Sequence, residues 1–255
     1  MFRQEAEAFF GALRCFTRLP VPAWVGHSQE ALDRAARYFP LVGLLVGVLG
    51  GLTFLLAAFV LPVSIALLLS MAATLLATGA FHEDGLADAV DGFGGGWTKP
   101  QVLAIMKDSR IGSYGAIAIG LMLLAKFNAL YELPDAWIAP AIVAAHAASR
   151  FCSTALIYAL DYVRDDDSSR AKPLAVRMGA GSLAVAGLFG LAPLVLLPWQ
   201  AAGAGLLLAV LTTFLAARYF VRRIGGYTGD CLGATQQGAE LAIYVGILAV
   251  AWNFS

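Results

Sequence analysis

The chain has 255 residues, of which 60% are hydrophobic and only 13% are charged. A soluble globular chain carries roughly a quarter charged residues, so this composition excludes a single water-soluble domain and favours a bundle of membrane helices. The 17 basic and 17 acidic residues cancel, which gives no support for nucleic-acid binding. Three scattered cysteines without a CxxC pair argue against a disulfide framework or a zinc site.

The N-terminal residues 1–16 alternate apolar and charged side chains. This pattern predicts an amphipathic helix rather than the uninterrupted apolar core of a secretory signal. We therefore expect residues 1–38 to form a cytoplasmic segment ahead of the first membrane span.

Seven apolar runs follow, and most approach the ~20 residues that a helix needs to cross the hydrocarbon core. Tight links at Leu61-Pro62 and Pro198-Trp199 predict antiparallel helical hairpins. No internal repeat or second domain is visible, so we expect one all-α membrane domain over 1–255. The predicted spans are 39–60, 63–81, 114–131, 136–160, 180–198, 200–220 and 239–254.

Basic residues are distributed very unevenly between the two sides that these spans define. Fifteen of the 17 lie in, or at the edge of, the segments that share a side with the N-terminus. Because cytoplasmic loops carry the excess of lysine and arginine, we expect the N-terminus in the cytoplasm and the C-terminus outside. The cytoplasmic segments would be 1–38, 82–113, 161–179 and 221–238.

An acidic segment begins where the second predicted span ends. Asp84, Asp88 and Asp91 are spaced i, i+4 and i+7, which places them within an arc of about 60° on a helix. Glu83 lies just off that arc. Carboxylates this close repel one another, and hard oxygen ligands of this kind suit Mg²⁺. The alternative is a solvated helix face at the membrane edge, but acids beside a bilayer are costly unless they are used.

The rest of this segment offers groups that bind phosphate. The glycine-rich turn 92–96 would let the backbone approach a phosphate closely, although a flexible turn explains it equally well. Lys107 and Arg110 would hold phosphate oxygens, or else anchor the cytoplasmic side. Asp108 has no such role in topology, because acidic residues contribute little to orientation.

Two further polar patches face the same side. Arg170 and Lys172 follow an acidic tract and are plausible anion contacts, and residues 225–237 are rich in glycine and hydrogen-bonding groups. We interpret 225–240 as a second wall of the site. Within the fourth span, Arg150 is a functional candidate, with a structural ion pair as the alternative, and His146 is interpreted as a core residue.

Together these features predict a reaction class. Carboxylates, glycine-rich turns and cations at a cytoplasmic membrane face suit the metal-assisted cleavage of a diphosphate, with an amphipathic or large substrate.

The sequence resembles the cobalamin synthase family, the adenosylcobinamide-GDP ribazoletransferases. The similarity lies in four motifs in the expected order, together with Glu240. These motifs are ALRCFTRLPVP (12–22), FHEDGLADAVDG (81–92), IMKDSRIGSYG (105–115) and GGYTGDCLGATQQ (225–237).

This resemblance implies an Mg²⁺-dependent membrane enzyme. It would join adenosylcobinamide-GDP to α-ribazole, or to its 5′-phosphate, and release GMP. A homo-oligomer, or an association with other cobalamin-pathway enzymes, is compatible with this role.

The expected site residues divide by role. Either His82 or a carboxylate would accept the hydroxyl proton, although His82 is equally well explained as a polar cap at the interface. The expected catalytic groups are His82, Asp84 and Asp88; the metal ligands Glu83, Asp84, Asp88, Asp91 and Asp108; and the substrate contacts Lys107, Arg110, Arg150, Lys172, Asp230, Gln236 and Gln237.

Three other functions each account for part of the sequence. A CDP-alcohol phosphotransferase would need an arginine where Asp88 stands, and Asp84-x-x-x-Asp88 gives only short support for a prenyltransferase. A transporter would explain Lys126 and Arg150 inside spans, but no inverted repeat accompanies them.

Overall fold

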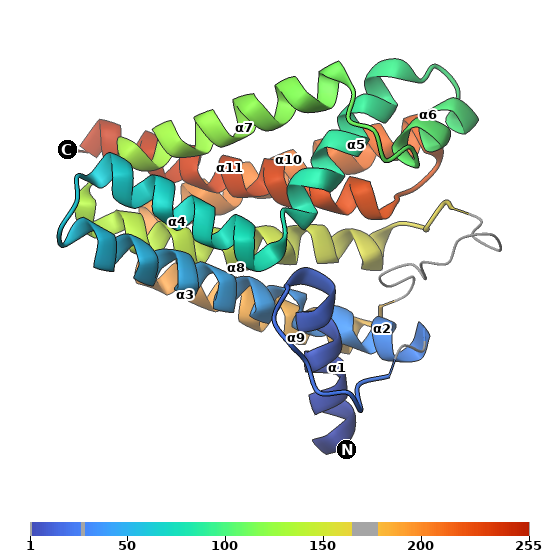
Figure 1. Ribbon diagram of the computed structural model, residues 1–255, viewed down its shortest axis with the longest axis horizontal. Coiled ribbons are helices and arrows are strands. Elements are labelled where there is room, and N and C mark those ends of the chain that lie inside the picture. The colour runs from blue at the N-terminus through green and yellow to red at the C-terminus, as the bar shows by residue number, and fades with distance from the viewer. Residues whose placement is uncertain (1, 27–28, 165–177, 255) are drawn as a thin grey trace.

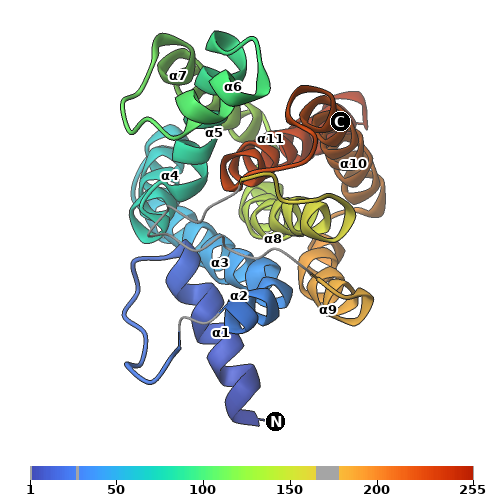
Figure 2. The ribbon, with the colours of Figure 1, turned by 90° about the vertical axis from the view of Figure 1, so that its right-hand side faces the viewer.

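The computed structural model describes residues 2–26, 29–164 and 178–254. Helices make up every element of these ranges except an isolated bridge between Tyr162 and Tyr227, which confirms the all-α prediction. The long helices lie side by side along one axis (Figures 1 and 2). The elements are α1 (Phe2–Phe16), α2 (Gln29–Ala35), η1 (Ala36–Tyr38), α3 (Phe39–Ala58), α4 (Val63–Thr78), α5 (Phe81–Gly95), α6 (Lys99–Met106), α7 (Ser113–Tyr131), α8 (Asp135–Ala159), α9 (Ala180–Leu191), η2 (Ala192–Leu196), α10 (Trp199–Ile224) and α11 (Gly229–Phe254).

Each of the seven predicted apolar runs lies on helix. Within the described ranges, four helices are long and apolar enough to cross a membrane: Glu30–Ala58, α7, α8 and α10. A fifth candidate is the pair α4 and α5, which bends by 84° at its break, while Ala180–Leu196 is shorter. The chain is thus a polytopic helical membrane protein, and the count of seven spans remains a prediction.

Helix α8 lies at the centre of the bundle. Of its apolar window, 78% is buried, against 22% for α7 and 17% for α10, which face outward. Gly43, Gly47 and Gly51 form a stripe on α3, and a Cβ on Gly47 would come within 2.9 Å of the Val143 Cα on α8. Small residues at this spacing let two membrane helices approach closely.

Helix α11 uses glycine in the same way on two sides. A Cβ on Gly246 would lie 2.6 Å from the Gly205 Cα of α10, and a Cβ on Gly233 would lie 3.1 Å from the Gly85 Cα of α5. The acidic helix α5 is therefore held against the polar first turns of α11.

A sharp elbow separates α4 from α5. Gly79 (φ 66°) and Ala80 (φ 58°) are both left-handed, which is unusual for alanine because its Cβ crowds the backbone. The Arg18 N–H donates to the Ala77 carbonyl at 2.8 Å, and Phe16 packs against Phe81. The N-terminal segment thus braces the elbow from which α5 starts.

The polar segments gather at one end of the bundle. Helices α5 and α6 lie at the right of Figure 1, whereas the C-terminus and the α3–α4 turn lie at the left. Loop 161–164 meets loop 225–228 at the polar end, where the Tyr227 N–H donates to the Asp161 carbonyl at 2.9 Å. Segments far apart in sequence therefore build a single site region.

Candidate active site

Asp84 and Asp88 form an acidic face of α5, the helix that follows the apolar helix α4. Asp84 is exposed and Asp88 half-buried, one turn further along. Burial, with the nearby charges of Asp230 and Asp84, raises the pKa of Asp88 to about 7. Three carboxylates from α5 and the start of α11 therefore crowd one place, and a cation would relieve their repulsion.

Arg164 is the cation of this cluster. Its Nη2 donates to the Asp230 Oδ2 at 2.6 Å, and its side chain is 20% exposed. Burial raises the pKa of Asp230 despite this pairing. In the sequence, Arg164 is only one of the fifteen basic residues on the cytoplasmic side, and nothing in its neighbourhood marks it. The contact with Asp230, 66 residues away, arises from the fold.

Asp91 faces away from this cluster into the protein. It is 8% exposed, and its carboxylate accepts the N–H of Gly112 at 2.7 Å and of Gly115 at 2.9 Å. Both donors lie at the start of α7, where backbone N–H groups have no helical partner. The structure gives Asp91 an anchoring role for this loop, and its metal-ligand role stays a prediction.

Asp108 and Arg110 pair with each other in the loop between α6 and α7. The Arg110 Nη2 donates to the Asp108 Oδ2 at 2.6 Å, and this bonding lowers the pKa of Asp108 to about 2. The Arg110 side chain is 86% exposed, so it can reach an anion at this end of the bundle. Lys107 is also exposed.

Arg223 holds the C-terminal end of α5, which contains the glycines at 92–95. From α10 it donates to the Gly96 carbonyl at 2.6 Å and the Phe93 carbonyl at 3.3 Å, at the C-terminal end of α5. Its guanidinium also lies over the rings of Phe93 and Tyr219. A cation at this helix end complements the unpaired carbonyls. The prediction of a glycine-rich turn over 92–96 was wrong, because residues 92–95 continue the helix and Gly96 is its C-cap.

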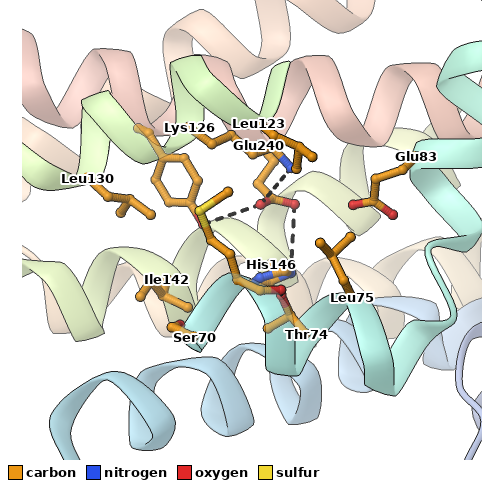
Figure 3. A pocket seen from close by; sticks show the side chains of 12 residues that line it. Ser70, Thr74, Leu75, Glu83, Leu123, Lys126, Leu130, Ile142, His146 and Glu240 are labelled. Atoms are coloured by element: carbon orange, nitrogen blue, oxygen red, sulfur yellow. Dashed lines mark hydrogen bonds and ion pairs between the residues drawn. The ribbon is translucent and has the colours of Figure 1, made fainter. Parts of the chain in front are cut away.

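Glu83 points into the bundle and not toward Asp84. Its Oε1 accepts from the Gln237 Nε2 at 2.9 Å, and the Gln237 Oε1 accepts from the Lys126 Nζ at 2.7 Å. Lys126 in turn pairs with Glu240 at 2.9 Å, with both side chains nearly inaccessible. Figure 3 shows Glu83, Lys126 and Glu240 around a cavity of about 30 Å³ that residues of α4, α5, α7, α8 and α11 line.

The same polar network continues into α8. The Gln236 Nε2 bonds both the Glu240 Oε2, at 2.7 Å, and the Ser149 Oγ, at 2.9 Å. Arg150 is 2% exposed and donates to the His146 carbonyl at 2.9 Å. Gln236, Gln237 and Arg150 are thus internal, and their roles as substrate contacts stay predictions.

His82 is also internal, 4% exposed and stacked on the Phe16 ring at 5.1 Å. Its proposed role as a base therefore gains no support from the geometry. Lys172 lies outside the described residues.

The acidic face can be tested for its fit to Mg²⁺. Among the described residues, no three His, Cys, Asp or Glu side chains form a ready metal cage. Mg²⁺ ordinarily keeps several waters and takes one or two carboxylates plus the phosphates of the substrate. The crowded pair Asp84 and Asp88 fits a site of this substrate-completed kind, whereas Glu83, Asp91 and Asp108 already have other partners.

Fold and site together define a polytopic α-helical membrane protein with an acidic site at one end of its bundle. The chain belongs to the cobalamin-5-phosphate synthase family, whose model matches residues 8–248. This confirms the resemblance seen in the four motifs.

Curated relatives match along nearly the whole chain. The adenosylcobinamide-GDP ribazoletransferase of Shewanella frigidimarina is 49% identical over 251 residues, covering 97% of this chain and 96% of the relative. The protein of the same name from Ralstonia pickettii is 49% identical over 250 residues, covering 97% of each. The one from Shewanella oneidensis is 46% identical over 252 residues, covering 98% and 96%. No solved structure matches the chain.

Proposed function

We propose that this protein is an Mg²⁺-dependent adenosylcobinamide-GDP ribazoletransferase of the bacterial inner membrane. The observation that carries the proposal is the cluster of Asp84, Asp88 and Asp230 beside Arg164, in a chain whose relatives bear that name. Carboxylates and a cation in one place suit a diphosphate substrate, whose cleavage depends chiefly on positioning and on charge neutralisation.

The reaction transfers the cobinamide-bearing phosphorus from the bridging oxygen of a diphosphate to an alcohol oxygen. A ribose hydroxyl oxygen that both acceptors carry, which is not the 5′-oxygen because α-ribazole 5′-phosphate has that one esterified, bonds to the phosphorus that carries the cobinamide. The bond from that phosphorus to the bridging oxygen breaks, and GMP leaves with this oxygen. The hydroxyl proton passes to a carboxylate of the acidic cluster.

Asp84 and Asp88 are the residues that would hold Mg²⁺, which supplies charge neutralisation for the diphosphate. Arg164 lies where it can exchange Asp230 for a phosphate oxygen, and Arg110 can exchange Asp108 in the same way. Arginine suits this role because its fork matches phosphate oxygens as well as carboxylates.

The site faces the cytoplasm in this proposal. The basic residues of its loops support that orientation under the positive-inside rule.

Turnover by the purified, detergent-solubilised protein tests the function. We expect adenosylcobinamide-GDP, either acceptor and Mg²⁺ to yield GMP and the corresponding cobalamin, and EDTA to stop both products together. Asp84→Ala should abolish turnover while the variant still inserts and elutes like the parent. A well-folded parent that forms no product would refute the proposed reaction, and normal turnover in Asp84→Ala would refute the metal assignment.

A further inference from the structure

A groove runs along the side of the bundle, between the α4–α5 elbow and α7. Its volume is about 440 Å³. Leu75 and Ala80 line it from the elbow side, and Ile119 and Leu123 from α7, with Glu83 and Asp84 as its carboxylates. The groove therefore combines apolar walls with two negative charges.

The groove is continuous with the acidic cluster at one end. Asp84 belongs to both, and Asp88 follows it by one helical turn. A substrate whose phosphate lies at the cluster would thus place an adjoining group in the groove.

The groove also meets the internal cavity. Leu75, Glu83 and Leu123 line both spaces. The Glu83 Oε2 is buried and has no hydrogen-bond partner in the part of the chain that the structure describes. An unpaired buried acceptor destabilises the protein, and a donor from a ligand would relieve this. The inner end of the groove can therefore accept a hydrogen bond from an N–H group of a ligand.

The surface around the groove is apolar. Leu76 on α4 and Ile117 and Leu121 on α7 are 71%, 61% and 62% exposed. In a membrane protein such side chains face lipid. The groove therefore suits an amphipathic ligand that lies at the membrane boundary.

We propose that this groove binds the corrin half of adenosylcobinamide-GDP. The proposal rests on the function proposed above and adds to it the place of one substrate half. A corrin presents apolar ring faces edged by primary amides, and its alkylcobalt(III) centre gives the ring system a net positive charge. Apolar walls complement the ring faces, the unpaired Oε2 of Glu83 complements the amides, and the carboxylate charge of Glu83 complements the positive charge. The guanosine half extends from the cluster toward water.

Binding of adenosylcobinamide alone, without nucleotide or turnover, tests the proposal by calorimetry in detergent. We expect Leu123→Trp, which fills the groove, to raise Kd by about tenfold or more. Leu124→Trp is the matched control, because Leu124 is 58% exposed and does not line the groove. In turnover, Leu123→Trp should raise KM for adenosylcobinamide-GDP and leave KM for α-ribazole unchanged.

A second measurement does not depend on the fold of a tryptophan variant. Ile119→Cys, in a background without the three natural cysteines, should react with a maleimide, and adenosylcobinamide should slow this reaction where GMP does not. The proposal that the groove binds the corrin half would be refuted if Leu123→Trp and Leu124→Trp changed Kd equally. It would also be refuted if adenosylcobinamide left the rate of maleimide labelling unchanged. If the unmodified protein turns over normally in that case, the proposed function still stands. If adenosylcobinamide binds in the groove but the unmodified protein releases no GMP, the proposed function is refuted and the assignment of the groove to the corrin half stands.

Discussion

At the scale of single residues, position along the sequence was a poor guide to the role of each carboxylate. Asp84, Asp88 and Asp91 share a helical face by spacing, yet Asp91 ties down the start of α7. Glu83, next to Asp84, faces the inside of the bundle. Helical geometry predicts which residues share a side, but the neighbour that each one meets depends on the packing of α7 and α11.

The substitution Asp88→Asn should lower the activity of the protein and raise its stability. We expect turnover to fall on the order of 100-fold or more, since a charge that the reaction uses is lost. In EDTA the variant should unfold about 2–4 °C higher, roughly 1 kcal/mol after allowance for solvent screening, because the repulsion among the acids is relieved.

The pH dependence of this gain follows from the raised pKa. The pKa of Asp88 rises from 3.8 to about 7 on folding. The free energy of unfolding of the unmodified protein therefore falls as the pH rises between these two values. The advantage of Asp88→Asn should therefore grow from pH 5 to pH 7 and stay constant above. Thermal unfolding at several pH values checks this, and an advantage that shrinks as the pH rises would contradict it.

At the scale of helices, apolar length and turn residues predicted most elements well. Helices α3, α7, α8 and α10 lie where apolar runs of nearly 20 residues or more were expected, and Pro62 and Pro198 cap α4 and α10 as the tight links required. The elbow at Gly79 and Ala80 escaped prediction, since alanine gives no local signal for a left-handed conformation. That conformation is imposed by tertiary contacts and not by local preference.

The glycine stripe on α3 supports a prediction at this scale. Gly47→Val should lower the unfolding temperature by about 2–12 °C, because overpacking a close helix contact costs about 1–3 kcal/mol. Gly120→Val on α7 is the control, since a Cβ there meets nothing within 4 Å. Thermal unfolding in detergent measures both, and equal stability of the two variants would show that α3 and α8 are not so tightly packed.

At the scale of the whole molecule, the distribution of charge predicted that the polar loops share one end, and the fold gathers them there. The sequence could not predict which acidic residue pairs with which basic residue at that end. Pairs such as Arg164 with Asp230 join segments 66 residues apart, and no spacing rule connects them.

Seven membrane spans would place the two termini on opposite sides of the membrane. A periplasmic phosphatase fused after Phe254 should be active in a bacterial host, and the same reporter fused to the N-terminus should be inactive. A cytoplasmic fluorescent reporter should give the inverse result. Matching signals from both ends would require an even number of spans and would contradict seven.

The buried pair of Lys126 and Glu240 has a consequence for biogenesis. Lys126 enters the membrane with α7. Its hydrogen-bond partner Gln237 lies 111 residues later, on the same helix as its ion-pair partner Glu240. At about 5–20 residues per second, α7 exists for roughly 6–20 seconds before α11 is made. During that time Lys126, inside a candidate membrane span, has neither Gln237 nor Glu240 as a partner, which disfavours release of α7 into lipid. Insertion of α7 should therefore be delayed at the translocon until α11 emerges, so that the last helix completes the insertion of an earlier one.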